Sequence, residues 1–387
     1  MKRSREPAET IEAMGPYLRS LGITRVARQT GLDRTGMPCF SCIRPDATTL
    51  TVSQGKGLTE DQARVSAIME AAEFAVAESP LVASILASPL ELEERGEAYF
   101  VPYRLMPMGL GLSRKTSIHW LKGELAFSRR SMLVPMAAVR LAPRQTELPG
   151  ICQTTNGLAS GNDLEEALVA ALCELIERDA NTIWSLRDPG QRTGSAVSTS
   201  SFDDPEVRWL AKRLKAEAIE LRLFDQMSDC STPTFMAAIG TFGGAGTRYQ
   251  VAAGFGTHLD PVHAVLRAIT EALQSRITAI ASTRDDLMAS SFSETIRADD
   301  LAIFRAPQES SLRAKFKRGT PSTAINILSQ LQSRLERAGV DEPIMVDLSG
   351  DALPCKVVRV LSNDLEDMGA NANWRPGRRA VSSLCAA

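Results

Sequence analysis

Apolar residues recur at helical spacing in a long stretch near the middle of the chain, residues 153–180. They return every three or four residues and form one stripe: Leu164, Leu168, Leu172, Leu175 and Ile176. A polar turn over residues 154–161 precedes the stripe, and either Asn162 or Asp163 can cap the helix that follows. The pattern therefore predicts a capped amphipathic helix in this stretch.

Other helices and strands alternate with this helix along the chain. Helices are predicted over residues 60–78 with Thr59 as the cap, from Asp260 to about residue 280, and over residues 204–217 and 322–338. Short apolar or alternating runs predict strands at residues 50–53, 117–122, 131–135, 219–225, 233–241, 248–256, 342–348 and 356–361. Strands 233–241 and 248–256 flank a glycine-rich turn at 243–246 and are expected to pair. The predicted class is α/β or α+β, with mixed sheets and packed helices.

The chain is long for one domain, though a single large α/β unit is possible, and residues 1–21 are expected to form an N-terminal arm or helix. Its 387 residues are 44% hydrophobic and 23% charged, with a formal net charge of −2. This balance argues against broad binding to nucleic acid or to a membrane surface. No secretory signal or run of 18 apolar residues is present, so a cytoplasmic protein is predicted.

Seven cysteines are scattered along the chain. Cys39 and Cys42 have the spacing of a metal or redox pair, but no second pair accompanies them, and a zinc site needs about four ligands. Reduced thiols are the better interpretation.

Polar side chains repeat at helical spacing on each of the three longest predicted helices. The sets are Ser66, Glu70 and Glu73; Glu174, Glu177 and Arg178; and Arg267, Glu271 and Gln274. Each set alone could be a solvated face with ordinary salt bridges, such as Arg267 with Glu271. Alanines beside the sets would permit close approach of the helices, which favours a shared site. Several carboxylates around one site could hold Mg²⁺ together with substrate phosphates.

A glycine-flanked lysine, Lys56, follows the strand predicted at 50–53. The sequence SQGKG lacks the spacing of a Walker A loop, yet a lysine between two glycines can still reach a phosphate.

Three long motifs together resemble the YcaO superfamily: residues 53–73, 154–180 and 258–286, in this order. The resemblance extends over about residues 22–380, and the phrases GITRVARQTGLDRTGMP and RPDATTLTVSQGKG look most like the subgroup encoded beside TfuA-like proteins. It implies a YcaO-type fold with a non-Walker site for ATP and Mg²⁺. This fold would form a single catalytic domain over residues 22–380, followed by a C-terminal tail (381–387).

The resemblance also implies a chemistry. A nucleophile adds to a peptide-bond carbonyl, the resulting oxyanion takes the γ-phosphoryl group of ATP, and phosphate leaves. A Cys, Ser or Thr side chain as nucleophile gives an azoline, whereas an external sulfur donor gives a thioamide. The TfuA-linked subgroup implies thioamide formation, with a TfuA-like protein, a precursor peptide or protein and a sulfur donor as partners, and a homodimer is also considered. An azoline-forming cyclodehydratase is the alternative enzyme, and a non-catalytic peptide-binding scaffold is the alternative of another class.

The same resemblance implies residue roles. The metal ligands would be Glu70, Glu73, Glu174 and Glu177, and the catalytic residues Glu174, Glu177 and Arg178. The ATP contacts would be Lys56, Ser66, Asn156, Arg178, Glu271, Gln274 and Arg276. His119, His258 and His263 would be structural. Two features depart from the family: the C-terminus lacks a proline-rich ending, and SNDLE (362–366) replaces a VPGLE-like phrase.

Overall fold

A computed structural model of this protein describes residues 1–81, 84–142, 146–240, 251–287, 302, 305, 316–350 and 352–385. The bounds of nine α-helices and fifteen strands lie within these residues. The α-helices are α1 (Pro7–Met14), α2 (Glu60–Glu78), α3 (Pro89–Glu94), α4 (Leu164–Leu186), α5 (Pro189–Gly194), α6 (Pro205–Ala216), α7 (Pro261–Ala281), α9 (Ala324–Arg337) and α10 (Arg378–Cys385). Short 3-10 turns occur at Gly15–Tyr17, Thr30–Leu32, Met136–Ala138 and Thr199–Ser201.

The strands form three larger sheets and one small one. They are β1 (Arg25–Arg28), β2 (Cys39–Ile43), β3 (Val52–Lys56), β4 (Ile85–Ala87), β5 (Ile118–Leu125), β6 (Ser131–Pro135), β7 (Leu158–Gly161), β8 (Ala196–Val197), β9 (Phe202–Asp203), β10 (Glu220–Asp225), β11 (Thr234–Gly240), β12 (Val251–Thr257), β13 (Phe316–Lys317), β14 (Ile344–Asp347) and β15 (Lys356–Leu361). The sheet orders are β1-β2-β3, β12-β11-β10-β8 and β4-β5-β14-β15-β7 with β6 beside β5, while β13 pairs with β9. The predicted class of mixed sheets with packed helices is confirmed.

The three longest helices begin at capping residues, and the caps agree with the sequence pattern. The side chain of Thr59 accepts a hydrogen bond from the Gln62 backbone, and Asp260 accepts from the first turn of α7. Of the two candidates for α4, Asp163 is the cap, because its carboxylate accepts from the Glu166 backbone. Side-chain acceptors at these positions satisfy N–H groups that have no partner within the helix.

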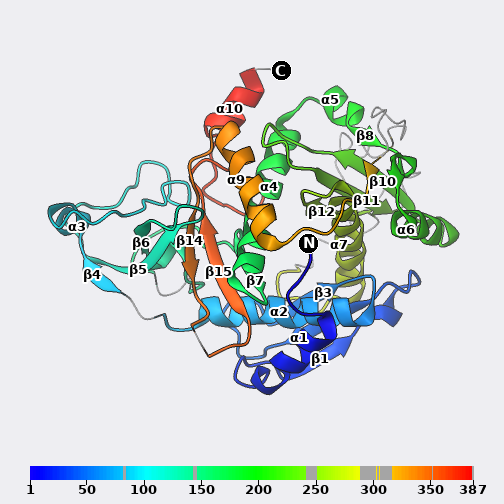
Figure 1. The fold of residues 1–387 in the computed structure, drawn as a ribbon, viewed down its shortest axis with the longest axis horizontal. Coiled ribbons are helices and arrows are strands. Elements are labelled where there is room, and N and C mark those ends of the chain that lie inside the picture. Colours follow the sequence, from blue (N-terminus) through cyan, green and yellow to red (C-terminus); the bar gives the residue numbers. More distant parts are fainter. Residues whose placement is uncertain are drawn as a thin grey trace.

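Each of these helices packs with its backbone against a glycine of the strand that precedes it. A Cβ on Gly55 of β3 would lie 2.0 Å from the Ala67 nitrogen of α2. On Gly161 of β7 it would lie 2.4 Å from the Ala167 nitrogen of α4, and on Gly254 of β12 only 2.1 Å from the α7 backbone. Alanines do permit close approach here, but the elements that approach these helices are strands. Figure 1 shows α2 along the lower part of the molecule, with α4 and α7 standing above it.

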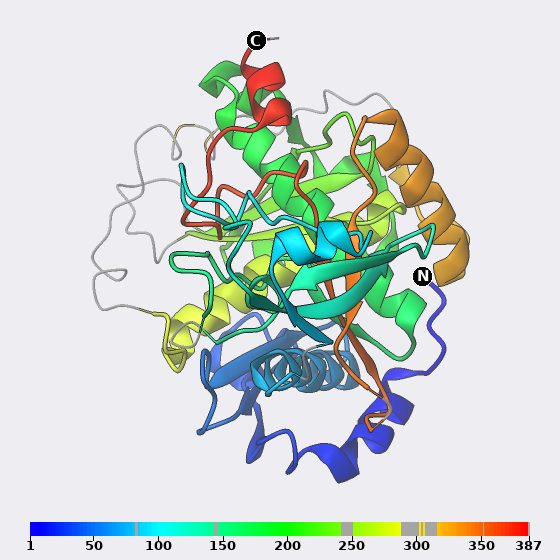
Figure 2. The ribbon, with the colours of Figure 1, turned by 90° about the vertical axis from the view of Figure 1, so that its left-hand side faces the viewer.

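The apolar stripe of α4 lies in a core built with α9, β14 and β15. Leu168 and Leu172 are completely buried, and Leu331 of α9 is buried in the same cluster. Burial of a leucine side chain contributes roughly 1.5–3 kcal/mol, so the stripe holds α4 firmly in place. Figure 2 shows α9 on the outer flank of the molecule.

Several predicted boundaries differ from the structure. The strand predicted at 50–53 runs later, as β3, so that Lys56 is its last residue. The polar turn predicted over 154–161 ends early, because residues from Leu158 onward pair with β15 as β7. Helix α4 continues beyond residue 180 to Leu186. Strands β11 and β12 pair as predicted, whereas the turn at 243–246 lies outside the described residues.

The two ends of the chain pack against the body. Helix α1 lies in the N-terminal segment predicted as an arm or helix and contributes Met14 to the core with α2. Helix α10 crosses the proposed tail boundary at residue 380 and contacts α4. Within the described part of the chain, no helix is both long and apolar enough to span a bilayer.

Candidate functional site

Five glutamates from three helices come together in one acidic site. Helix α2 contributes Glu70 and Glu73, α4 contributes Glu174 and Glu177, and α7 contributes Glu271. Glu73 interacts electrostatically with Glu70 and Glu174, and Glu177 interacts in the same way with Glu174 and Glu271. The glutamates that helical spacing placed on three separate helices therefore lie close enough to interact electrostatically.

Backbone groups of neighbouring strands hold these carboxylates in place. Glu70 accepts a 2.7 Å hydrogen bond from the Gln54 backbone of β3. Glu73 reaches across to β7, where it accepts from the Ser160 backbone at 2.8 Å and from the Ser160 hydroxyl at 2.6 Å. Each strand thus fixes a glutamate at the same place where its glycine admits a helix.

Helix α7 is joined to β3 by Lys56, the last residue of that strand. Its ammonium group lies 2.7 Å from Glu271, and the side-chain amide of Gln274 donates to the Gln54 carbonyl at 3.1 Å. A second oxygen of Glu271 accepts from the Phe255 backbone of β12 at 3.3 Å. The alternative surface pair of Glu271 with Arg267 is therefore not the arrangement found, since Glu271 is paired with Lys56 instead.

The site carries more negative charge than its cations relieve. Burial raises the pKa of Glu73 to about 8, with Glu70 and Glu174 adding to the effect. Burial likewise raises the pKa of Glu177 to about 7, helped by the neighbouring charge of Glu271. Burial also raises the pKa of Glu70 and of Glu174. A cation that entered the site would favour the ionised form of these groups.

Positive charge is gathered on the side of Glu271. Burial opposes the ionisation of Glu271, but Lys56 and Arg178 together hold its pKa below the usual range. Burial also opposes the charge of Arg178, yet the surrounding carboxylates, Glu177 first, raise its pKa. The Arg178 guanidinium lies 3.7 Å from Glu174, and these two side chains are 32% and 24% exposed. Solvent, and hence a ligand, can reach the boundary between the acidic and the basic side.

The donor set suits Mg²⁺ that is shared with a phosphate ligand. Glu177 is 3% exposed, and its Oε2 atom has no hydrogen-bond donor in the described part of the chain. No group of three Asp, Glu, His or Cys side chains among the described residues lies close enough to enclose a metal alone. Mg²⁺ in nucleotide sites is usually held by one or two carboxylates, waters and phosphate oxygens, so the residues present fit it.

Three of the predicted ATP contacts are not joined to this network by hydrogen bonds or ion pairs. Ser66 is half-buried on the α2 face that carries Glu70. Arg276 is held by Asp33, 3.1 Å away, near the start of β2. Asn156 lines a pocket beside β15, where its amide nitrogen donates to Asp367 at 3.0 Å.

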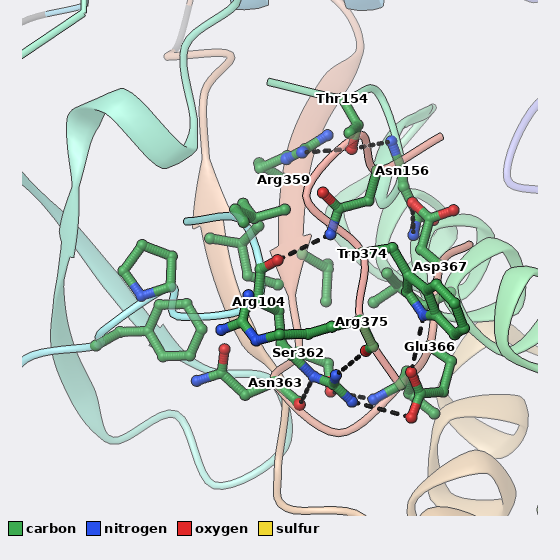
Figure 3. Close-up of a pocket in the computed structure, with 18 residues that line it drawn as sticks. Arg104, Thr154, Asn156, Arg359, Ser362, Asn363, Glu366, Asp367, Trp374 and Arg375 are labelled. Carbon is green, nitrogen blue, oxygen red and sulfur yellow. Dashed lines mark hydrogen bonds and ion pairs between the residues drawn. The ribbon is translucent and has the colours of Figure 1, made fainter. Parts of the chain in front are cut away.

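That pocket contains residues to which the sequence analysis assigns no role. It lies between β15 and the C-terminal segment (Figure 3), and Arg359 of β15 lines it together with Thr154 and Asp367. Burial lowers the pKa of Arg359 to about 10, an effect that Glu174 partly offsets. The signal in the sequence is an arginine in the middle of an otherwise apolar strand, KVVRVL.

Glu366, the last residue of the SNDLE phrase, anchors the segment that follows β15. Glu366, which is 1% exposed, pairs with Arg104 at 3.0 Å and accepts from the Trp374 indole at 3.0 Å. Its backbone nitrogen donates to Asp179 of α4, and Asp179 also binds the Arg379 guanidinium at 2.8 Å. The segment after β15 is thus joined to α4 at Asp179, the residue that follows Arg178.

Cysteines and histidines take no part in the acidic site through hydrogen bonds. All seven cysteines are free thiols, and burial raises the pKa of Cys39 and of Cys42 to about 12. Burial lowers the pKa of His258 to about 4, and its ring lies 4.4 Å from that of His263. His119 is paired with Glu147.

Comparison with known proteins identifies the family. The YcaO family model, described as an ATP- and Mg²⁺-binding cyclodehydratase, matches residues 54–366. The chain belongs to the YcaO family. An uncharacterized protein in the tfuA 3′ region of Rhizobium leguminosarum bv. trifolii is 34% identical, over 99% of this chain and 93% of that protein. An uncharacterized protein of Methanothermobacter thermautotrophicus is 32% identical, over 98% of each.

Solved YcaO structures share the fold. The YcaO protein of Methanopyrus kandleri, bound with AMPPCP and Mg²⁺, is 24% identical over 97% of this chain and 96% of that chain, with a TM-score of 0.71. A heterocyclase in complex with substrate and cofactor has a TM-score of 0.76 at 20% identity, over 94% of this chain and 53% of that chain. The predicted family, its TfuA-associated subgroup and the YcaO fold are confirmed. ATP and Mg²⁺ are also confirmed as the cofactors, and the family supports an ATP-dependent enzyme.

Proposed function

We propose that this protein uses ATP and Mg²⁺ to modify a backbone amide of a peptide or protein, and that the product is a thioamide. The observation that carries the proposal is the buried carboxylate Glu177, whose free oxygen lies in a site with four further glutamates beside Lys56 and Arg178. Such a site can bind a polyphosphate together with the cations that balance its charge. Phosphoryl transfer depends chiefly on positioning the phosphoryl group and neutralising its charge.

The glutamates divide into two pairs with separate anchors. Glu70 and Glu73 are held by strand backbones, so their carboxylates are fixed before any ligand enters. Glu174 and Glu177 share α4, one turn apart, and carry the raised pKa values that a cation would relieve. We assign all four to Mg²⁺. When bound, Mg²⁺ and ATP supply the phosphoryl group that turns the amide oxygen into a leaving group.

The remaining polar residues face the nucleotide in this proposal. Arg178 would neutralise charge on the phosphates, because its planar fork can bind two oxygens and its position between carboxylates keeps it charged. Lys56 and Gln274 would hold the phosphate side through their links to β3 and α7. Ser66, Glu271 and Arg276 stay in the proposed ATP set on the resemblance. The predicted contact of Asn156 with ATP also stays a prediction.

Thioamide formation is preferred to azoline formation because of the relative in a tfuA 3′ region, 34% identical over almost the whole chain. A TfuA-like protein would then be the partner, together with a sulfur donor and a precursor peptide, in the cytoplasm. Azoline formation remains the second candidate, since solved heterocyclases share this fold. In both reactions a nucleophile adds to the carbonyl carbon and the oxygen leaves as phosphate.

Phosphate release tests the enzyme against the scaffold. Purified protein with a TfuA-like partner, peptide, sulfide and Mg²⁺–ATP should release phosphate, and Glu174→Gln should abolish the release. Glu165→Gln, earlier on the same helix, is the matched control and should retain it. If Mg²⁺ and ATP do not bind the wild-type protein, the assignment of the site is refuted.

Product mass separates the two enzymes. Exchange of oxygen for sulfur makes the peptide heavier, whereas azoline formation removes the mass of one water. A product that has lost water in the presence of sulfide and the partner would overturn thioamide formation and support the second candidate.

A further inference from the structure

The pocket beside the acidic site has a chemical character of its own. It has a cavity volume of about 40 Å³ and opens to solvent between β15, the segment 362–375 and residues 100–105. Figure 3 shows its polar residues pointing inward from both sides, with Arg359 and Asn156 on one wall and Asn363 on another. Leu175, the neighbour of Glu174 on α4, closes the wall nearest the glutamates.

Two hydrogen-bond donors in this pocket are left unused. Arg359 lies within the six-stranded sheet, where its backbone is in register with Val346 of β14 and Leu158 of β7. The residue is 1% exposed, and Nη2 makes one long hydrogen bond, 3.4 Å, to the Thr154 hydroxyl. Nε and Nη1 have no acceptor among the described residues. A buried arginine without acceptors is costly, so the pair of donors points to a ligand.

Two acceptors in the same pocket are unused as well. The side-chain nitrogen of Asn156 donates to Asp367, and that of Asn363 donates to the Val101 carbonyl at 3.0 Å. These partners fix the orientation of both amides, so that each Oδ1 atom points away from the acceptor that its nitrogen contacts. Both Oδ1 atoms are buried, and neither has a donor in the part of the chain that is described.

We propose that this pocket binds a backbone amide of the substrate peptide, with Arg359 donating to its carbonyl oxygen and an asparagine oxygen accepting from its N–H. The proposal rests on the proposed function, because it names the chemistry that the same enzyme recognises in its substrate. A peptide unit offers both an acceptor and a donor, the two kinds of group that the unused donors and acceptors of the pocket require. An ionised carboxylate has no hydrogen to donate, so it would satisfy Arg359 but would leave both asparagine oxygens without a donor.

The pocket is placed to deliver such an amide to the acidic site. Arg359 is close enough to Glu174 for each to favour the charged form of the other. The Gly157 backbone amide, next to Asn156, also favours the ionised form of Glu174. Gly157 has φ +78°, and a Cβ there would lie 2.3 Å from the Val360 carbonyl oxygen. The turn that carries Asn156 is therefore held between β15 and the glutamates.

The test uses the full-length protein labelled with ¹⁵N-arginine and saturated with Mg²⁺–AMPPCP. The Nε–H resonance of Arg359 is identified as the one lost in Arg359→Lys. Titration with N-acetylglycine N-methylamide should shift this resonance saturably, whereas acetate and inorganic phosphate should not. An equal or stronger response to acetate or phosphate would overturn the proposal in favour of an anion site. No response to any probe would overturn it in favour of ordered water.

Calorimetry of AMPPCP binding on the same samples separates this inference from the proposed function. Nucleotide binding with a silent Arg359 refutes the peptide pocket alone. A response of Arg359 to the amide without nucleotide binding supports the pocket and refutes the proposed function.

A second variant distinguishes a binding residue from a structural one. Arg359→Met removes a buried charge that has no direct ion pair among the described residues, so its thermal unfolding temperature should equal or exceed that of the wild type. The affinity for N-acetylglycine N-methylamide, followed through ¹⁵N-asparagine side chains, should fall at least tenfold. Marked destabilisation with unchanged amide affinity would show that Arg359 serves the fold instead.

Discussion

Replacing Glu73 by glutamine should make the protein more stable at alkaline pH. The carboxylate is buried, and its pKa is raised from an ordinary 4.5 to about 8. Glutamine keeps the side-chain oxygen that accepts from Ser160 and removes the titrating group. The variant therefore tests the energetic cost of assembling carboxylates in the site without their cation.

The sign of the effect follows from proton binding. Between pH 4.5 and about 8, Glu73 is protonated in the folded protein but ionised in the unfolded chain. The folded state binds more protons there, so stability falls as pH rises through this window. With these two pKa values, Glu73 lowers the free energy of unfolding by roughly 3 kcal/mol between about pH 5.5 and about pH 8. Glu73→Gln should lose roughly 3 kcal/mol less than the wild type over the same interval.

Urea unfolding in EDTA at the two pH values measures the difference. Glu78→Gln is the matched control, since Glu78 is a buried carboxylate on the same helix with the opposite shift. Burial opposes its ionisation, but Thr49 and Arg44 outweigh burial and hold its pKa below the usual range. The control should be less stable at both pH values, by about 3–5 kcal/mol, because Arg44 loses its partner. A Glu73→Gln variant with the pH dependence of the wild type would refute the reasoning.

Three further predictions concern the frame of the site. Gly55→Ala should destabilise the protein by several kcal/mol in urea unfolding, because its Cβ would meet the α2 backbone at 2.0 Å, while Gly31→Ala, with open space around it, should not. Arg178→Lys should lower the rate of phosphate release about 10²-fold or more, because the planar fork is lost. Asp179→Asn should cost about 3 kcal/mol in thermal unfolding, because it leaves the buried Arg379 with one carboxylate fewer.

Each of these predictions has a clear contrary result. Equal stability of the two glycine variants would mean that α2 does not rest on the β3 backbone. Phosphate release by Arg178→Lys at the wild-type rate would remove the arginine from the proposed chemistry. An Asp179→Asn protein with unchanged unfolding would show that the tie between α4 and α10 contributes little.

The helices of the site could be predicted from the sequence because their signals are local. Thr59 and Asp260 precede apolar patterns with helical spacing, and both are the observed caps. Spacing also placed Glu174 and Glu177 on one face. Caps and periodicity depend on residues within a few positions, which a single sequence contains.

The links between the helices could not be predicted in this way. Lys56 and its partner Glu271 are 215 residues apart, and Glu73 and Ser160 are 87 apart. Neither pairing leaves a trace in local spacing, because it depends on how three sheets are placed around the helices. Arg359 can be recognised in the sequence as a charged residue within an apolar strand, but its role depends on the segment that folds over it.

The glycine contacts under α2, α4 and α7 have a consequence for redesign. Where backbone meets backbone, no side-chain volume can be exchanged to widen or narrow the spacing between each helix and the strand that it packs against. Substitutions in the surrounding core can change stability but leave little freedom to adjust the distances between the glutamates. The wall formed by residues 100–105 and 362–375 has no such constraint. Libraries that aim at new peptide substrates should vary that wall and keep the three strand glycines.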